Sequence, residues 1–288
     1  MIGAEETMDY LKKLNEEQRE AAMCTEGPLL IIAGAGSGKT RVLTMRIAHL
    51  IEQCHVWPNK ILASTMTHRI AYMIEEKGIS PYNILAVTFT NKAAKEMRDR
   101  VEALIGSGIN MWIMTFHSAC LRILRSNAEI LGYGRDFAVY DPADQKTLVK
   151  NISKELSIDS KKYKPAFFLG EISRAKEKEI SPEAYAAVYG DGMKERIVYQ
   201  VYREYSRHLK KNNAMDFDDL LLNTVKLFEK DEAVLLRYQN RFRYIMVDEY
   251  QDTNQIQYKF IKMLAEAHDN ICVVGDDDQC IYQWRGAD

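Results

Sequence analysis

The order of apolar and polar positions along the chain predicts strands that alternate with helices. Short apolar runs that end in turn residues read as buried strands at 29–33, 84–88, 244–248 and 271–275. The first three are followed by helical spacing, at 39–53, 91–106 and 254–267. Apolar strands that are each followed by a helix predict an α/β fold, with a parallel sheet covered by helices on both faces.

A long segment in the middle of the chain breaks this alternation. Residues 119–213 lack clear strand patterns and show helical spacing instead, as in 194–209. We therefore expect an all-helical subdomain inserted into the α/β domain. Ligands of such a sheet gather at the carboxyl ends of its strands, so the turns that follow the apolar runs are the candidate sites.

The first of these turns has the pattern of a phosphate-binding loop. Residues 29–40 read LLIIAGAGSGKT, an apolar run, a glycine-rich turn and the start of a helix. The glycines let successive backbone N–H groups converge on phosphate oxygens, and the helix dipole adds to the attraction. Lys39 would reach the β- and γ-phosphates, and the Thr40 hydroxyl would bind Mg²⁺. Ala33 stands where the general pattern has glycine.

Two further turns complete a candidate nucleotide site. The apolar run at 244–247 ends in Asp248 and Glu249, which would hold Mg²⁺ and polarise the attacking water. An adjacent acidic pair in a solvated loop is the alternative, but its position after a strand favours the site. The last segment, GDDDQCIYQWRGAD (275–288), places an amide and a guanidinium beside two aromatics. That set suits nucleotide sensing coupled to a nucleic-acid strand, although a plain loop with a buried Trp is the alternative.

Taken together, the motifs resemble those of the UvrD/Rep/PcrA-type DNA helicases of superfamily 1. The matching segments occur in the family's order from residue 14 to 288: LNEEQREA, AGAGSGKTR, AVTFTNKAAKEM, TFHS, MDFDDLL, VDEYQDTN and GDDDQCIYQWRGAD. The resemblance implies a P-loop NTPase with a RecA-like domain at 1–118 and 214–288, interrupted by a helical subdomain at 119–213. It also implies ATP and Mg²⁺ as cofactors and single-stranded DNA as partner.

The resemblance assigns roles residue by residue. The implied catalytic residues are Lys39, Asp248, Glu249, Gln279 and Arg285, the last two as γ-phosphate sensors. The implied nucleotide-binding residues are Gln18, Ala35, Gly36, Ser37, Gly38, Lys39, Thr40 and Arg41, with Thr40 and Asp248 on the metal. The implied DNA-binding residues are Thr88, Phe89, Thr115, His117, Tyr282 and Trp284. For Phe89 and His117 taken alone, core packing is the alternative role.

The family's motor works between two RecA-like domains, and the chain ends after the third ATP motif. We therefore expect the second domain to be missing, so that this chain binds nucleotide weakly, hydrolyses it slowly and does not unwind DNA. The parent is expected to be an ATP-dependent 3′-to-5′ translocase. Two alternatives stay open: the motor part of a helicase–nuclease of the RecB/AddA kind, and a nucleic-acid-binding scaffold that does not hydrolyse ATP.

One feature departs from the family. Residues 43–65 are nearly repeated by 66–88, with eleven identical positions at an offset of 23. Family members carry one such unit, so this is a tandem duplication of a helix, a turn and a strand. We expect the second strand, at 84–88, to occupy the sheet. The strand-like run 60–65 and the helix 66–77 would then be surplus and extruded, and Ile70, Met73 and Ile74 would need cover from another chain or domain. The alternative is that the strand of the first copy occupies the sheet and displaces the DNA-contacting segment.

Composition adds limits on compartment and charge. The formal net charge is −2, so any nucleic-acid track must be local. The five cysteines are scattered and form no CxxC pair, which indicates reduced thiols and no metal site. No apolar stretch approaches the length of a membrane span. We expect a soluble protein without membrane contact, and the resemblance implies the cytoplasm.

Overall fold

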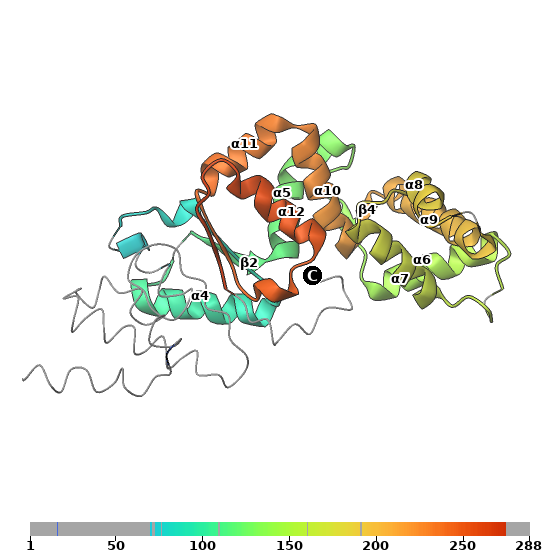
Figure 1. Cartoon of the computed structure of the whole chain (residues 1–288), viewed down its shortest axis with the longest axis horizontal. Helices are drawn as coiled ribbons and strands as arrows, with labels where there is room; N and C mark the ends of the chain where they lie inside the picture. Colours follow the sequence, from blue (N-terminus) through green and yellow to red (C-terminus); the bar gives the residue numbers. More distant parts are fainter. Residues whose placement is uncertain are drawn as a thin grey trace, which may run out of the picture. The chain divides into compact units, whose positions relative to one another are not determined.

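The computed structural model describes residues 16, 70, 73–75, 77–108, 110–159, 161–190 and 192–274 (Figure 1). The chain forms two compact units. The described part of the first unit runs up to residue 114 and includes 242–251 and 270–274. The second unit contains residues 115–241 and 252–269.

The first unit is built on a sheet with the strand order β2-β1-β5-β6. Its strands are β1 (Ile84–Thr88), β2 (Trp112–Thr115), β5 (Tyr244–Val247) and β6 (Ile271–Val273). β1 runs parallel to β5 with Ala86 opposite Met246, and β5 runs parallel to β6 with Met246 opposite Cys272. The parallel strands predicted from the apolar runs at 84–88, 244–248 and 271–275 are confirmed, and the run at 29–33 lies outside the described residues.

β1 is buried on both faces, which is why its sequence is a continuous apolar run rather than an alternating one. All five of its residues are buried. A short 3-10 helix, η3 (Pro81–Asn83), leads into it, and helix α4 (Asn91–Ile105) follows it. The Thr90 side chain caps α4 by accepting a hydrogen bond from the backbone N–H of Ala93 at 3.1 Å.

The core of the first unit shows that one expectation about the duplication is wrong. Ile70 and Met73, on the helix of the second copy, are buried in one cluster with Ile84 and Ala86 of β1. Met97 and Val101 of α4, Met111, Ile113 of β2 and Met246 of β5 belong to the same cluster. The apolar face of this helix is therefore covered by its own sheet and by α4, and it is not extruded. The sequence indicates the order of helices and strands along the chain, but it does not show which copy packs on β1.

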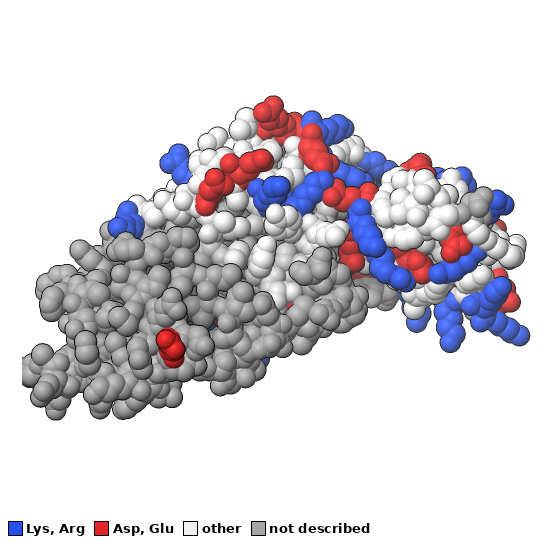
Figure 2. Space-filling view, in the orientation of Figure 1, with Lys and Arg blue, Asp and Glu red and all other residues white. Residues whose placement is uncertain are grey.

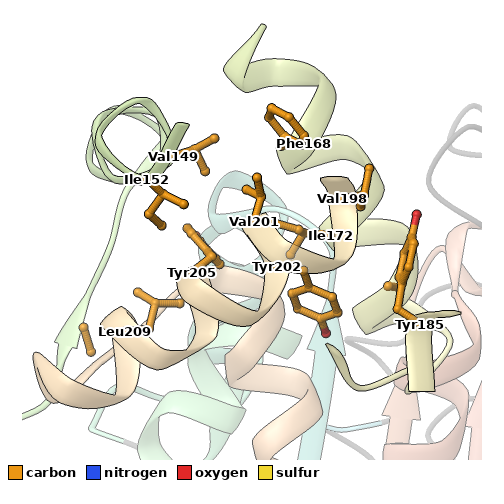
Figure 3. Packing of buried hydrophobic residues seen from close by; sticks show 12 residues of the cluster. Val149, Ile152, Phe168, Ile172, Tyr185, Val198, Val201, Tyr202, Tyr205 and Leu209 are labelled. Carbon is orange, nitrogen blue, oxygen red and sulfur yellow. The ribbon is translucent and has the colours of Figure 1, made fainter. Parts of the chain in front are cut away.

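The second unit contains a helical cluster with its own core. Its helices are α6 (Pro142–Glu155), α7 (Pro165–Glu177), α8 (Pro182–Tyr189) and α9 (Met193–Lys211). Figure 3 shows side chains of these helices converging, among them Ile152, Phe168, Ile172 and Tyr202. The helix expected at 194–209 is confirmed as part of α9.

Two short strands modify the expectation of an all-helical segment. β3 (Ala138–Val139) lies within 119–213 and pairs in parallel with β4 (Ala214–Met215). Strands of two residues show no periodicity, so the sequence pattern could not reveal them.

The remaining helices of the second unit pack around α10. They are α5 (Phe116–Asn127), α10 (Phe217–Lys230), α11 (Glu232–Arg241) and α12 (Gln255–Ala265) (Figure 1). The ring of Phe260 on α12 stacks on Phe228 of α10 and meets Phe116 of α5 edge-on, with centroids 6.1 and 6.4 Å apart. These helices share a compact unit with α6–α9, so the units do not follow the domain limits of 118 and 214. Those limits stay a prediction.

Candidate functional site

The acidic pair lies at the carboxyl end of β5, as expected for ligand-binding residues of a parallel sheet. The backbone N–H of Asp248 donates to the carbonyl of Val87 at 3.0 Å, and that of Val274 donates to the carbonyl of Val247 at 2.9 Å. The turn after β5 is therefore held between the ends of its two neighbouring strands. Asp248 is partly buried, whereas Glu249 is exposed.

The two carboxylates differ in environment. Burial, together with the charge of Glu249, raises the pKa of Asp248 above its ordinary value. Glu249 has a φ of 55°, in the left-handed region that residues with a side chain rarely adopt. Its Oε2 accepts a hydrogen bond from Gln251 Nε2 at 2.7 Å. A partly buried carboxylate next to a second negative charge is a place where a divalent cation is favoured.

The predicted DNA-binding residues of the first unit lie just beyond β1. Thr88 is fully buried, and its hydroxyl has no hydrogen-bond partner within the described structure. Phe89 is partly exposed in the turn that precedes α4. Of these two residues, Phe89 is therefore the one with surface to offer a base.

Thr115 and His117 have different surroundings in the second unit. The Thr115 hydroxyl caps α5 by accepting from the backbone N–H of Ser118 at 3.2 Å, so it has a structural task. The ring of His117 meets Phe217 edge-on, with centroids 5.9 Å apart. Phe217 is 43% exposed although it is a large apolar residue. Phe217 is not among the residues predicted from the sequence to bind DNA. The feature that could have indicated its exposure is an aromatic residue flanked by acidic residues in MDFDDLL.

The same motif contributes to a buried ionic cluster that the sequence did not reveal. Lys176 of α7 is only 2% exposed, and its Nζ lies 2.7 Å from Asp216 Oδ2 and 2.7 Å from Asp219 Oδ1. The Tyr205 hydroxyl of α9 donates to Asp216 Oδ2 at 2.9 Å. Asp216 and Asp219 also form the capping box at the start of α10. The cluster thus joins α7, α9 and α10.

Opposed effects set the ionisation of this cluster. Burial alone would lower the pKa of Lys176, but the carboxylates of Asp216 and Asp219 raise it above its ordinary value. Burial would likewise raise the pKa of Asp216, yet the Lys176 ammonium lowers it. Burial and the charge of Asp216 raise the pKa of Asp219 to about 6. The Lys176 ammonium therefore keeps Asp216 ionised, whereas Asp219 titrates at a higher pH than an ordinary aspartate.

The other predicted site residues lie outside the described residues. They are Gln18, Ala35, Gly36, Ser37, Gly38, Lys39, Thr40, Arg41, Gln279, Tyr282, Trp284 and Arg285. The first copy of the duplicated unit, 43–65, also lies outside them. Among the residues that are described, no group of three or more His, Cys, Asp or Glu could hold a metal ion. A magnesium site needs only one or two carboxylates beside the phosphates, so Asp248 fits that chemistry.

A match to a known family shows which kind of protein has this sequence. The model of the UvrD/REP helicase N-terminal domain matches the chain in two segments, 14–69 and 64–288. The chain belongs to the UvrD/Rep helicase family. The two matched segments overlap at the junction of the duplicated units, so each segment contains one whole copy.

Individual relatives agree with the family match. The chain is 50% identical over 279 residues to a protein named ATP-dependent DNA helicase PcrA from Bacillus subtilis, covering 96% of this chain and 34% of the relative. It is also 50% identical to the protein of the same name from Staphylococcus epidermidis, covering 35% of that relative. The chain thus spans about a third of the length of the relatives it matches. In the part of this UvrD/Rep-family chain that the structure describes, no helix is long and apolar enough to cross a membrane.

Proposed function

We propose that the chain is the ATP-binding motor part of a DNA helicase that moves 3′-to-5′ along single-stranded DNA. The observation that carries the proposal is the hydrogen bond from the Asp248 backbone to Val87. It joins the turn with the acidic pair to the strand that leads into Phe89. A change at the nucleotide would thereby reach a residue proposed to touch DNA.

Nucleotide chemistry would be divided between the two acids. In this proposal Asp248 and Thr40 hold Mg²⁺, and Glu249 polarises the attacking water. The bound Mg²⁺ would neutralise negative charge on the phosphates. Lys39 with Ala35, Gly36, Ser37 and Gly38 would cradle those phosphates, while Gln18 and Arg41 contact the base or ribose. Gln279 and Arg285 would sense the γ-phosphate.

Among the described strands, β6 lies at one side of the sheet. Within the described structure β6 pairs only with β5, and Ile271 and Val274 are 42% and 45% exposed. An apolar strand edge of this kind is normally paired or covered. We infer that the phosphate loop lies near Asp248, because ligands of a parallel sheet gather at the carboxyl ends of its strands.

DNA binding would use local charge together with aromatic side chains. The segment 142–211 contains fifteen Lys and Arg against ten Asp and Glu, although the whole chain has a net charge of −2. Figure 2 shows basic side chains on this part of the second unit, interspersed with acidic ones. A local excess of positive charge favours phosphate contacts, and Phe89, His117, Tyr282 and Trp284 would stack on or line the bases. Thr88 and Thr115 belong to the same proposal as residues near the strand's backbone, although both are buried and Thr88 exposes no surface for direct contact.

The larger organisation belongs to the same proposal. We infer a RecA-like domain at 1–118 and 214–288 and a helical subdomain at 119–213, acting in the cytoplasm. The whole protein would complete the ATP site with a second RecA-like domain. Arginine fingers supplied to phosphoryl transfer are worth roughly 10³–10⁵ in turnover, so hydrolysis without them would be very slow.

The proposal is tested by titrating a labelled oligo(dT) with this chain and following fluorescence anisotropy. Phe89→Ala is expected to weaken binding about fivefold to a hundredfold, because stacking is worth ~1–3 kcal/mol per base. Tyr82→Ala is the matched control, since Tyr82 is also an exposed aromatic of the first unit. Unchanged affinity in Phe89→Ala, or an equal loss in both variants, would contradict the proposed contact.

A further inference from the structure

The position that β1 occupies in the sheet is a well-defined slot for a duplicated element. The strand lies between β2 and β5, with Ala86 opposite Met246, and is buried on both faces. Ile70 and Met73, from the helix of the same copy, are buried in the cluster that contains Ile84 and Ala86. We call this position, with the helical cover over it, the β1 slot. It holds the second copy, 66–88.

The first copy contains what the β1 slot requires at most buried positions. Ile61, Leu62 and Ala63 are identical to Ile84, Leu85 and Ala86 of β1. On the helix, Ile47 and Leu50 stand where Ile70 and Met73 are buried. Exchanges between apolar residues of similar volume are the best-tolerated changes in a core. The family model matches the chain in two segments that each contain one complete copy.

Among the positions at which the copies differ, two disfavour the first copy in the β1 slot. Val87 is fully buried and pairs with Val247, whereas its counterpart in the first copy is Ser64. A serine there would lose apolar burial and leave a hydroxyl without water. Gly78 has a φ of +63°, whereas its counterpart is His55. Residues with a side chain are disfavoured in that conformation, even though nothing lies within 4 Å of a Cβ at this position.

We propose that the β1 slot accepts either copy of the duplicated unit, and that Val87 and Gly78 select the second copy. The selection has a consequence for the chain that follows. With the second copy seated, the strand leads directly into Phe89 and α4. With the first copy seated, Thr65 would lead into Met66, and 23 more residues would separate the strand from Phe89. The duplication is thus a two-state element that places or withdraws Phe89.

Two deletions of equal length test whether either copy suffices. Deleting 43–65 leaves the second copy and deleting 66–88 leaves the first, and both restore a single unit between the phosphate loop and Phe89. Both variants are expected to unfold cooperatively by thermal melting, with the lower Tm in the variant that keeps the first copy. Adding His55→Gly and Ser64→Val to that variant should recover most of the difference. The proposal is overturned if the rescued variant stays unfolded, or if deletion of 43–65 prevents folding.

Peptide-resolved hydrogen exchange on the full chain tests the selection itself. In the unsubstituted chain, amides of 84–88 should be protected against exchange, because β1 lies between β2 and β5 in the sheet. A variant that trades the four distinguishing residues, His55→Gly with Gly78→His and Ser64→Val with Val87→Ser, has the same composition. In this variant, protection against exchange should move to 61–65. The copy that has glycine and valine at the two exchanged positions should be favoured in the β1 slot on the order of a hundredfold over the copy that has histidine and serine. Protection that stays at 84–88 would overturn the selection.

A DNA-binding readout, which rests on the proposed function, separates the two hypotheses. The four-site variant should bind labelled oligo(dT) as weakly as Phe89→Ala does. If exchange protection moves while DNA affinity is unchanged, the slot proposal stands and the role of Phe89 fails. If neither changes, the slot proposal fails and the role of Phe89 is judged by Phe89→Ala alone.

Discussion

At the scale of single residues, the buried ammonium of Lys176 shows how strongly one charge depends on its partners. Its Nζ has carboxylate oxygens of Asp216 and Asp219 at 2.7 Å, and its side chain is almost fully enclosed. Removing one partner of a buried ion pair leaves a charge without solvent or counterion, and this costs more than the pair contributes. The cluster is therefore a sensitive point of the second unit.

Lys176→Met should lower the free energy of unfolding by about 3–5 kcal/mol, because two carboxylates lose their buried counterion. The measurement is urea denaturation at pH 7 followed by circular dichroism. Lys178→Met is the matched control, since Lys178 is exposed two residues further along and should change stability by less than about 0.5 kcal/mol. Equal stabilities of the two variants would mean that the cluster does not hold the helices together.

At the scale of elements, the start of α10 combines helix capping with a titrating group. Asp216 Oδ1 accepts from the Asp219 backbone N–H at 2.8 Å, and Asp219 Oδ2 accepts from the Asp216 backbone N–H at 3.2 Å. The pKa of Asp219 is raised to about 6 by burial and by the charge of Asp216. Between its ordinary value and 6, the folded chain holds a proton that the unfolded chain has released. Stability from this group is therefore lost as the pH rises through that window.

Asp219→Asn should remove this loss, because the amide keeps an acceptor for the cap but does not titrate. In thermal melting from pH 4.5 to 6.5, ionisation of Asp219 should lower the Tm of the unsubstituted chain as the pH rises. The variant should lack this decrease. Asp218→Asn, in the same turn of α10, should keep the original pH dependence. Parallel pH profiles for Asp219→Asn and the unsubstituted chain would show that Asp219 does not titrate in this range.

Which elements could be predicted from sequence follows from how they are stabilised. β1 and β5 are buried strands, so their apolar runs predicted them, and α9 has the periodicity of a helix with one buried face. β3 and β4 are two residues each and are defined only by their pairing. The partners of Lys176 lie 40 and 43 residues away in the sequence, and only the packing of helices brings them together.

In the candidate site, the sequence indicated the residues at strand ends but not the contacts that depend on packing. An acidic pair after an apolar run marked Asp248 and Glu249 because chemistry at the end of a parallel strand depends on local sequence. The burial of Thr88 and the contact between His117 and Phe217 depend on tertiary packing, and no local pattern encodes them. The cover over Ile70 and Met73 was mispredicted for the same reason.

At the scale of the whole molecule, the chain forms two compact units. The first contains the sheet edge with Asp248, Glu249 and Phe89. The second contains the helical cluster with its excess of basic residues and the ionic cluster around Lys176. Family membership and the hydrogen bond between the ends of β1 and β5 support the proposal of a nucleotide-driven motor. The claim that unites them is that a phosphate loop containing Lys39 completes the site.

The most direct test of that claim is titration of a fluorescent ATP analogue with Mg²⁺ on this chain, on Lys39→Ala and on Lys211→Ala. We predict saturable binding by the unsubstituted chain, loss of that binding in Lys39→Ala, and full binding in Lys211→Ala, because Lys211 is exposed on the second unit. Equal binding by the unsubstituted chain and Lys39→Ala, or no binding by the unsubstituted chain, would contradict the account.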